Sequence, residues 1–228
     1  MTVDAEGRVA LRQDARRNRE RLIKAATEVF SEQGLDASLG EIARRAGVGD
    51  ATLYRRFPTR ADLYAAVYAE AQETIHHLGE QALLIEDGWA ALSTYLESTC
   101  EFTATNRAVS DLQMATVPDT PSPVEGWERP SEILTELIDR AKRQGSLHPS
   151  VTMEDILVAL YSVQLMVPAS AGTAPDAWRR QLAFILRGLH ANGGSALPTV
   201  PALTAPQLQA IGLRLFLRGA AEQRVNQA

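Results

Sequence analysis

The most restrictive feature of the sequence is a short segment, residues 50–56, that lies between a glycine turn and a proline. The surrounding stretch reads GVGDATLYRRF and covers residues 47–57. Glycines at both ends of GVG predict a tight turn, and Pro58 disfavours helical geometry at Phe57. The space between them fits a helix of about two turns, on which Leu53 and Phe57 share one face.

Two further helices are predicted before this segment. The first begins at about Ala15 and ends at Gly34, the usual position of a helix-terminating glycine. Its apolar residues recur at i, i+4, i+7 and i+8: Leu22, Ala26, Val29 and Phe30. Ser38 with Glu41 predicts a capping box for the second helix, which ends at Gly47. Two short helices joined by a tight turn are a helix-turn-helix.

The rest of the chain also has helical periodicity, and no alternating strand pattern is present. Thr59 with Asp62 predicts a capping box for a long helix that ends at about Leu78. Further helices are expected over about 89–102, 107–115, 131–144, 153–170, 175–191 and 204–218, with a proline-rich loop over 116–130. The fold class is therefore all-α. We expect a flexible N-terminal arm over 1–14, a helix-turn-helix domain over 15–60 and a helical domain over 61–228.

Bulk properties exclude several protein classes. The chain has 228 residues, of which 45% are hydrophobic, so it can bury a core. A single cysteine, Cys100, allows neither an intrachain disulfide nor a thiolate zinc site. The chain has no apolar run of about 18 residues, which predicts no membrane span, and no signal-peptide pattern. We expect a soluble cytoplasmic protein.

Charge is distributed unevenly along the chain. Residues 1–60 carry 12 Lys or Arg and 9 Asp or Glu, a net charge of +3, whereas residues 61–228 carry 11 and 19, a net charge of −8. A basic N-terminal domain on an acidic body favours contact between that domain and a polyanion.

The predicted helix over 50–56 has the chemistry of a DNA reader. Thr52, Arg55 and Arg56 stand at i, i+3 and i+4, so they share a face opposite the apolar one. The hydroxyl of Tyr54, at the side, can reach a phosphate. Arginine presents a planar fork of donors that matches guanine or phosphate. The alternative is an ordinary solvated surface with two arginines.

Residues 15 to about 70 resemble the DNA-binding domain of the tetracycline-repressor (TetR) family. The similar stretches are ARRNRERLIKAATEVFSEQGLDASLGEIARRAGVGDATLYRRF and PTRADLYAAV. The resemblance implies a homodimer that inserts residues 50–56 of each subunit into successive major grooves of a palindromic operator. It also implies DNA contacts for residues within and beside the segment Ser38 to Phe57. Thr52, Arg55 and Arg56 would approach bases or nearby phosphates, and Ser38, Tyr54 and Arg60 would hold phosphates. Gly49 and Arg56 depart from the residues that are frequent in the family.

The resemblance further implies that the body dimerises and binds a small-molecule effector. The helices over 153–170 and 175–191 are the candidates for the dimer contact, the alternative being that their apolar stripes are monomer core. Pocket candidates are apolar or aromatic residues with a few polar groups. They are Trp89, Tyr95, Cys100, Phe102, Met114, Trp127, Tyr161 and Gln164, and each could instead be a core residue. This set favours a hydrophobic or aromatic effector.

A mechanism follows from the expected long helix after Arg60, which joins the two domains. A ligand that favours one tilt of this helix would change the spacing of the two DNA-binding domains and lower operator affinity. We therefore predict a repressor that its ligand releases. The rival is a ligand-independent DNA-binding protein or constitutive repressor. We expect no enzyme, because the sequence has no nucleophile motif or phosphate-binding glycine loop, and neither a cofactor nor a metal site.

Overall fold

In the computed structural model, residues 3–114, 132–192, 201–207 and 210–211 are described. They form the helices α1 (Val3–Gln33), α2 (Leu39–Ala46), α3 (Asp50–Arg56), α4 (Arg60–Leu83), α5 (Gly88–Thr105), α6 (Arg107–Met114), α7 (Glu132–Arg143), α8 (Met153–Ser170) and α9 (Ala177–Leu189). Within these ranges there is no strand, only an isolated bridge between Leu147 and His190. The all-α prediction is confirmed.

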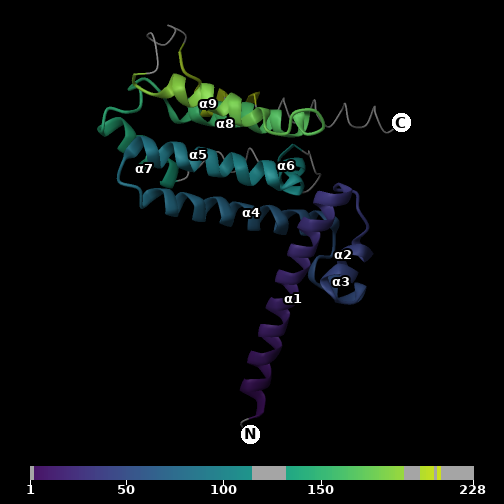
Figure 1. Cartoon of the computed structure of the whole chain (residues 1–228). Helices are drawn as coiled ribbons and strands as arrows, with labels where there is room; N and C mark the ends of the chain where they lie inside the picture. The colour runs from purple at the N-terminus through teal and green to yellow at the C-terminus, as the bar shows by residue number, and fades with distance from the viewer. Residues whose placement is uncertain (1–2, 115–131, 193–200, 208–209, 212–228) are drawn as a thin grey trace.

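The body is built in layers, as Figure 1 shows. Helix α4 forms one layer, α5 and α7 form the next, and α8 with α9 covers them on the far side. Helices α2 and α3 lie beside α1 at one end of α4. None of the described helices is both long and apolar enough to cross a membrane.

The first buried cluster fills the N-terminal region. It joins side chains of α1, α2 and α3 to the first turns of α4, and it also includes Ala108 and Leu112 of α6. The Ser31 hydroxyl accepts a hydrogen bond from the Ala108 N–H at 3.1 Å, which fixes the start of α6 on α1. This core therefore continues past residue 60, where the sequence predicted the domain boundary.

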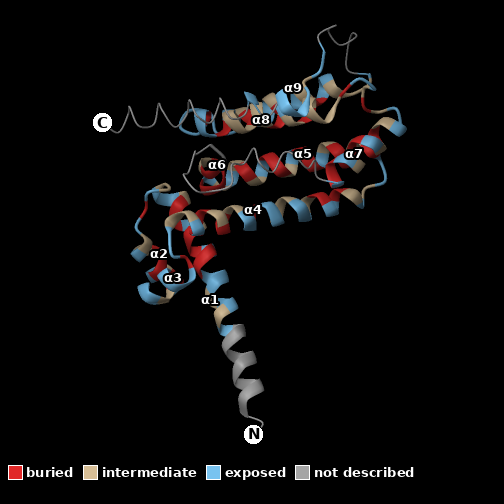
Figure 2. Cartoon of the chain, turned by 180° about the vertical axis from the view of Figure 1, so that it is seen from behind, coloured by how far each residue is buried: buried red, intermediate tan, exposed pale blue. Residues whose placement is uncertain are grey.

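The second buried cluster fills the body and draws on α5, α7, α8 and α9. Helix α4 belongs to both cores: Leu63 and Val67 lie in the first, and Ala82 lies in the second. Figure 2 shows the buried residues on the faces that the layers turn to each other. A change in the packing of the body can therefore reach the N-terminal region through one continuous helix.

Local signals placed several helix ends correctly. A capping box forms at Thr59 with Asp62, as predicted, and a second one forms at Thr152 with Asp155. Thr204 and Gln207 exchange hydrogen bonds in the same way, although most of the predicted helix 204–218 lies outside the described residues. The predicted loop over 116–130 also lies outside them. Helix α4 continues to Leu83, about a turn and a half beyond the predicted end at Leu78.

The sequence placed the start of the first helix at about Ala15, whereas α1 begins at Val3. The prediction relied on the absence of an apolar stripe. The segment nevertheless consists largely of good helix formers, among them alanine, arginine, leucine and glutamate, and contains no proline. The part of α1 from Leu22 onward packs in the N-terminal core. Residues of this kind can extend an existing helix towards the N-terminus, because elongation costs less than nucleation.

Candidate nucleic-acid interface

The turn between α2 and α3 is made by residues 47–49, as the sequence predicted. Gly47 has φ 64° and ψ 39°, the left-handed conformation that glycine adopts without strain, and its N–H caps α2 on the carbonyls of Ala43 and Arg44. Gly49 is the N-cap of α3 in an extended conformation and provides no side-chain cap. Val48 packs against the N-terminal core between them. The turn thus sets the angle between the two helices.

Helix α3 buries one face and exposes the other. Leu53 is 1% exposed and Phe57 is 4% exposed, and both belong to the N-terminal core. Tyr54 is 52% exposed, and Arg55 is exposed beside it. Arg55 makes no hydrogen bond or ion pair with any residue in the described ranges, so its guanidinium is available to an external ligand. Thr52, the third expected contact on this face, is half-buried.

Arg56 is engaged within the chain. Its side chain is exposed, but Nη2 donates a hydrogen bond of 2.8 Å to the carbonyl oxygen of Ala15 in α1. This bond ties the end of α3 to α1, and the guanidinium of Arg19 lies 6.0 Å from the ring centroid of Phe57 at the same place. No sequence signal could have indicated the bond, because its acceptor is a backbone carbonyl 41 residues away.

Arg60 is likewise engaged within the chain. Its Nη1 donates to the carbonyls of Leu35 and Ala37, each at 2.8 Å, and the Tyr64 hydroxyl donates to Leu35 at 2.6 Å. These bonds hold the connection between α1 and α2. The role that the resemblance implies for Arg60, a phosphate contact, therefore competes with a structural one.

The capping box predicted at Ser38 does not form. Ser38 is the N-cap of α2 by backbone conformation, but its side chain makes no capping hydrogen bond. Glu41 instead accepts two hydrogen bonds from Arg44, at 2.6 and 2.8 Å, and this bonding lowers the pKa of the Glu41 carboxyl. Ser38 is exposed, so its hydroxyl and the first amides of α2 face solvent. Such groups suit an anion.

A second carboxylate pairing fixes α2 on α1. Arg45 donates to both oxygens of Glu32 at 2.6 and 2.8 Å, and the hydrogen bond lowers the pKa of Glu32. The arginines of α2 are thus neutralised by acids, whereas Arg55 of α3 is not. On α1, Arg16 and Arg17 are paired with acids as well, whereas Arg19 forms no ion pair with a described residue.

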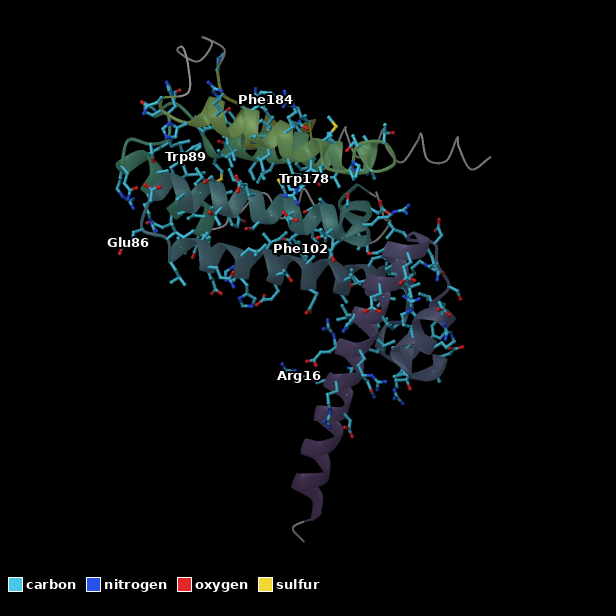
Figure 3. The ribbon with its side chains drawn as sticks, viewed as in Figure 1. Arg16, Glu86, Trp89, Phe102, Trp178 and Phe184 are labelled. Carbon is cyan, nitrogen blue, oxygen red and sulfur yellow. The ribbon has the colours of Figure 1, made fainter. Side chains whose placement is uncertain are left out.

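Two of the described pocket candidates, Trp89 and Phe102, line different grooves. Trp89 packs edge to face on His190, with ring centroids 4.7 Å apart, and lines a groove of about 430 Å³. Phe102 lines another groove of about 630 Å³, between α4, α5 and α9, together with Trp178. Figure 3 shows Trp89 and Phe102 towards opposite ends of α5. Glu97 lines both grooves, a role that its sequence context did not indicate.

The other candidates occupy different surroundings. Tyr95 and Cys100 are buried in the body core, and burial raises the pKa of the Cys100 thiol to about 12. Tyr161 is half-buried, and burial with Tyr68 nearby raises its pKa. Gln164 is half-buried on the same helix, α8. The Met114 side chain and Trp127 lie outside the described residues.

In the part of the chain that the structure describes, no three histidine, cysteine or acidic side chains lie close enough together to hold a metal ion. His76 and His77 instead pair with acids of their own helix, α4. Glu80 lies 3.6 Å from His76 and 2.8 Å from His77.

Comparison with known proteins identifies both halves of the chain. The family model described as bacterial regulatory proteins, tetR family, matches residues 22–67. The model described as the C-terminal domain of SbtR-like transcriptional regulators matches residues 87–191. Helix α3 lies within the first match, and α5, α7, α8 and α9 lie within the second.

Individual relatives agree with these matches. An HTH-type transcriptional regulator of Staphylococcus aureus is 29% identical over 101 residues, which cover 43% of this chain and 55% of that protein. The HTH-type transcriptional regulator TtgW of Pseudomonas putida is 39% identical over 80 residues, which cover 35% of this chain and 60% of that protein. The chain thus spans little more than half the length of these curated relatives. The crystal structure of a TetR transcriptional regulator from Streptomyces coelicolor superposes with a TM-score of 0.57 at 29% identity, covering 76% of this chain and 99% of that one.

Proposed function

The chain belongs to the TetR family of bacterial regulatory proteins, and we propose that it regulates transcription by binding duplex DNA through α3. The observation that carries this proposal is the presentation of α3. Leu53 and Phe57 anchor the helix in the core, and Tyr54 and Arg55 are left on its outer face. A short helix held in this way fits the major groove, where an arginine fork can pair with guanine.

The test is binding to DNA from the region upstream of the chain's own gene, with variants of matched charge. Arg55→Ala removes an exposed arginine from α3, and Arg143→Ala removes an exposed arginine from α7 of the body. Loss of a base contact weakens specific binding by about 1–3 kcal/mol in each half-site, so Arg55→Ala should bind at least about tenfold more weakly. Arg143→Ala should bind like the unaltered chain. Equal affinity for all three proteins, or no specific site in a genome-wide selection, would contradict the proposal.

We also propose that the chain is a homodimer whose interface is formed by α8 and α9. These helices pack on each other and carry large apolar side chains on the molecular surface: Val158 and Met166 on α8 and Phe184 on α9, with exposed fractions of 39%, 37% and 61%. Exposed apolar side chains on neighbouring helices favour burial in an interface. Two copies of such a pair would make a four-helix contact.

The dimer proposal is tested by sedimentation of two variants. Phe184→Asp places a charge on the proposed interface, whereas Leu84→Asp places one on a still more exposed apolar residue at the end of α4. We expect the first variant to be monomeric and the second to sediment like the unaltered chain. A dimer that tolerates Phe184→Asp would place the interface elsewhere.

The remaining part of the proposal is repression that a small hydrophobic or aromatic effector relieves. It is supported by the two aromatic-lined grooves and by α4, which belongs to both cores. If an effector shifts α4, the two copies of α3 leave the spacing of about 34–36 Å that successive major grooves require. A panel of aromatic compounds should contain members that raise the unfolding temperature and also lower affinity for the operator. Compounds that bind the body without changing operator affinity would favour a ligand-independent regulator.

A further inference from the structure

One face of helix α5 lines a groove instead of packing in the core. The core face of the helix carries Leu92, Leu96 and Cys100, which are buried in the body. The larger groove, of about 630 Å³, is lined on α5 by Glu97, Ser98, Glu101 and Phe102, and α4 and α9 complete it. We call it the α5 groove. Its volume lies within the range of small-molecule sites, about 300–1,000 Å³.

The α5 groove offers apolar surface to the body of a ligand. Phe102 of α5 and Leu78 of α4 are half-buried along it, and Trp178 and Leu182 of α9 are each 3% exposed beside them. Figure 3 shows Phe102 and Trp178 closer to the N-terminal region than Trp89. Because Leu78 belongs to α4, a ligand in this groove touches the helix that joins the two cores.

The positive charge of the α5 groove is already compensated. Arg179 donates through Nη2 to Glu101 at 2.6 Å and through Nε to Asp176 at 3.2 Å. The hydrogen bond from Arg179 lowers the pKa of the Glu101 carboxyl. The Arg179 guanidinium also lies 4.5 Å from the centroid of the Trp178 ring. Two carboxylates and an aromatic face therefore hold this arginine, and an anionic ligand would have to displace them.

Glu97 is the negative charge that remains. It is exposed on the groove wall, one helical turn before Glu101, and makes no hydrogen bond or ion pair with any described residue. Glu97, Glu101 and Asp176 together with Arg179 make three carboxylates and one guanidinium, a net charge of −2. A ligand in the α5 groove thus meets an excess of negative charge next to apolar surface.

The smaller groove, of about 430 Å³, differs in its charge. Glu97 and Ala183 line it as well, so the two grooves adjoin. Arg187 of α9 also lines it, is exposed, and forms no ion pair with a described residue. The positive charge of Arg187 opposes a cation in this groove and is absent from the described lining of the α5 groove. A cation is therefore favoured in the α5 groove.

We infer that the α5 groove binds an amphipathic organic cation, with one positively charged centre on an aromatic or aliphatic body. The Glu97 carboxylate attracts the charge, the ring face of Phe102 favours the same sign, and the apolar residues bury the body. This inference rests on the effector that the proposed function includes, and it assigns that effector a charge and a groove. Complementary charge gives selectivity among ligands of similar shape.

The experiment compares two probes of nearly equal shape and opposite charge, tetraphenylphosphonium and tetraphenylborate. Binding of each to the full chain is measured by titration calorimetry without DNA. Glu97→Gln removes the unpaired charge of the groove. Glu86→Gln is the matched control, because Glu86 is also exposed, its carboxylate has no described partner, and Figure 3 shows it at the far end of the body from Phe102. Unfolding temperatures of both variants check that the fold is retained.

We expect the unaltered chain to bind the phosphonium more tightly than the borate. Glu97→Gln should bind the phosphonium about three- to tenfold more weakly, as for loss of a partly exposed charge contact, and Glu86→Gln should bind it like the unaltered chain. A second pair locates the site: Phe102→Leu should weaken binding of the phosphonium, whereas Trp89→Leu, in the smaller groove, should not.

Three results would overturn the inference: no binding of the phosphonium, tighter binding of the borate, or equal losses in Glu97→Gln and Glu86→Gln. None of them touches the DNA-binding proposal, because no DNA is present in the titration. A chain that binds the phosphonium as expected but no DNA would refute the proposed function and leave the cation site standing.

Discussion

Replacing Arg60 by methionine separates a structural role from a DNA contact at one position. Methionine keeps an unbranched apolar stem but removes every donor. In the structure Arg60 holds the carbonyls of Leu35 and Ala37, and Leu35 keeps a second donor in the Tyr64 hydroxyl. The carbonyl of Ala37 is therefore the group that loses its partner. A hydrogen bond from a charged donor to a partly buried carbonyl contributes about 1.5–3 kcal/mol, so we expect the free energy of unfolding to fall by that amount.

Two quantities are measured: the unfolding temperature, and the slope of log K for DNA binding against log salt concentration, which we call the salt slope. Arg55→Met is the matched variant. For a chain of this size about 1 kcal/mol corresponds to about 2–4 °C, so Arg60→Met should unfold about 3–12 °C earlier. Arg55 makes no bond to a described residue, and Arg55→Met should leave the unfolding temperature unchanged but reduce DNA binding. An Arg60→Met variant with full stability and a salt slope lower by about 1 per subunit would refute the reasoning and support the phosphate contact that the family resemblance implies.

Three further predictions concern packing, pH and thiol reactivity. Gly88→Ala places a Cβ about 2.8 Å from backbone atoms of Ala141, so chemical denaturation should show a loss of about 1–3 kcal/mol; unchanged stability would mean that α5 and α7 can separate. Hydrogen bonds from Thr59 lower the pKa of Asp62, so its stabilisation is present above the unfolded pKa of about 3.9 and is lost as pH falls through the lower folded pKa. Asp62→Asn should therefore weaken the acid-side decline of stability, and identical pH profiles would contradict this. Burial raises the pKa of Cys100 to about 12, so iodoacetamide at about pH 8 should modify it only in denaturant, and rapid reaction of the folded chain would show that the body opens.

Local patterns predicted the helices well because their causes are local. Helix α3 spans Asp50–Arg56, as the glycine turn and the proline indicated, and α8 spans Met153–Ser170, the range expected from its periodicity. Where two local effects competed, the prediction failed. Residues 3–14 lack an apolar stripe but have high helix propensity, and propensity prevailed. At Ser38 the side chain of Glu41 bonds to Arg44 rather than to the helix start.

The candidate DNA contacts were only partly predictable. The exposed position of Arg55 follows from helical register, since Leu53 and Phe57 must face the core. The partners of Arg56 and Arg60 do not, because both bind backbone carbonyls of distant segments. The grooves on the body were also beyond prediction, because α5 and α9 form them across more than seventy residues of chain.

The sequence alone thus determined the all-α class, the helix-turn-helix and the uneven charge, since each depends on spacing and composition within a short window. Tertiary structure alone decided which arginines remain free. Arg55 and Arg19 form no ion pair with a described residue, whereas Arg45 of α2 pairs with Glu32 of α1. An arginine has the same charge in every context, and only the packing of α1, α2 and α3 brings a distant acid or carbonyl within reach of some guanidinium groups and leaves others exposed to solvent.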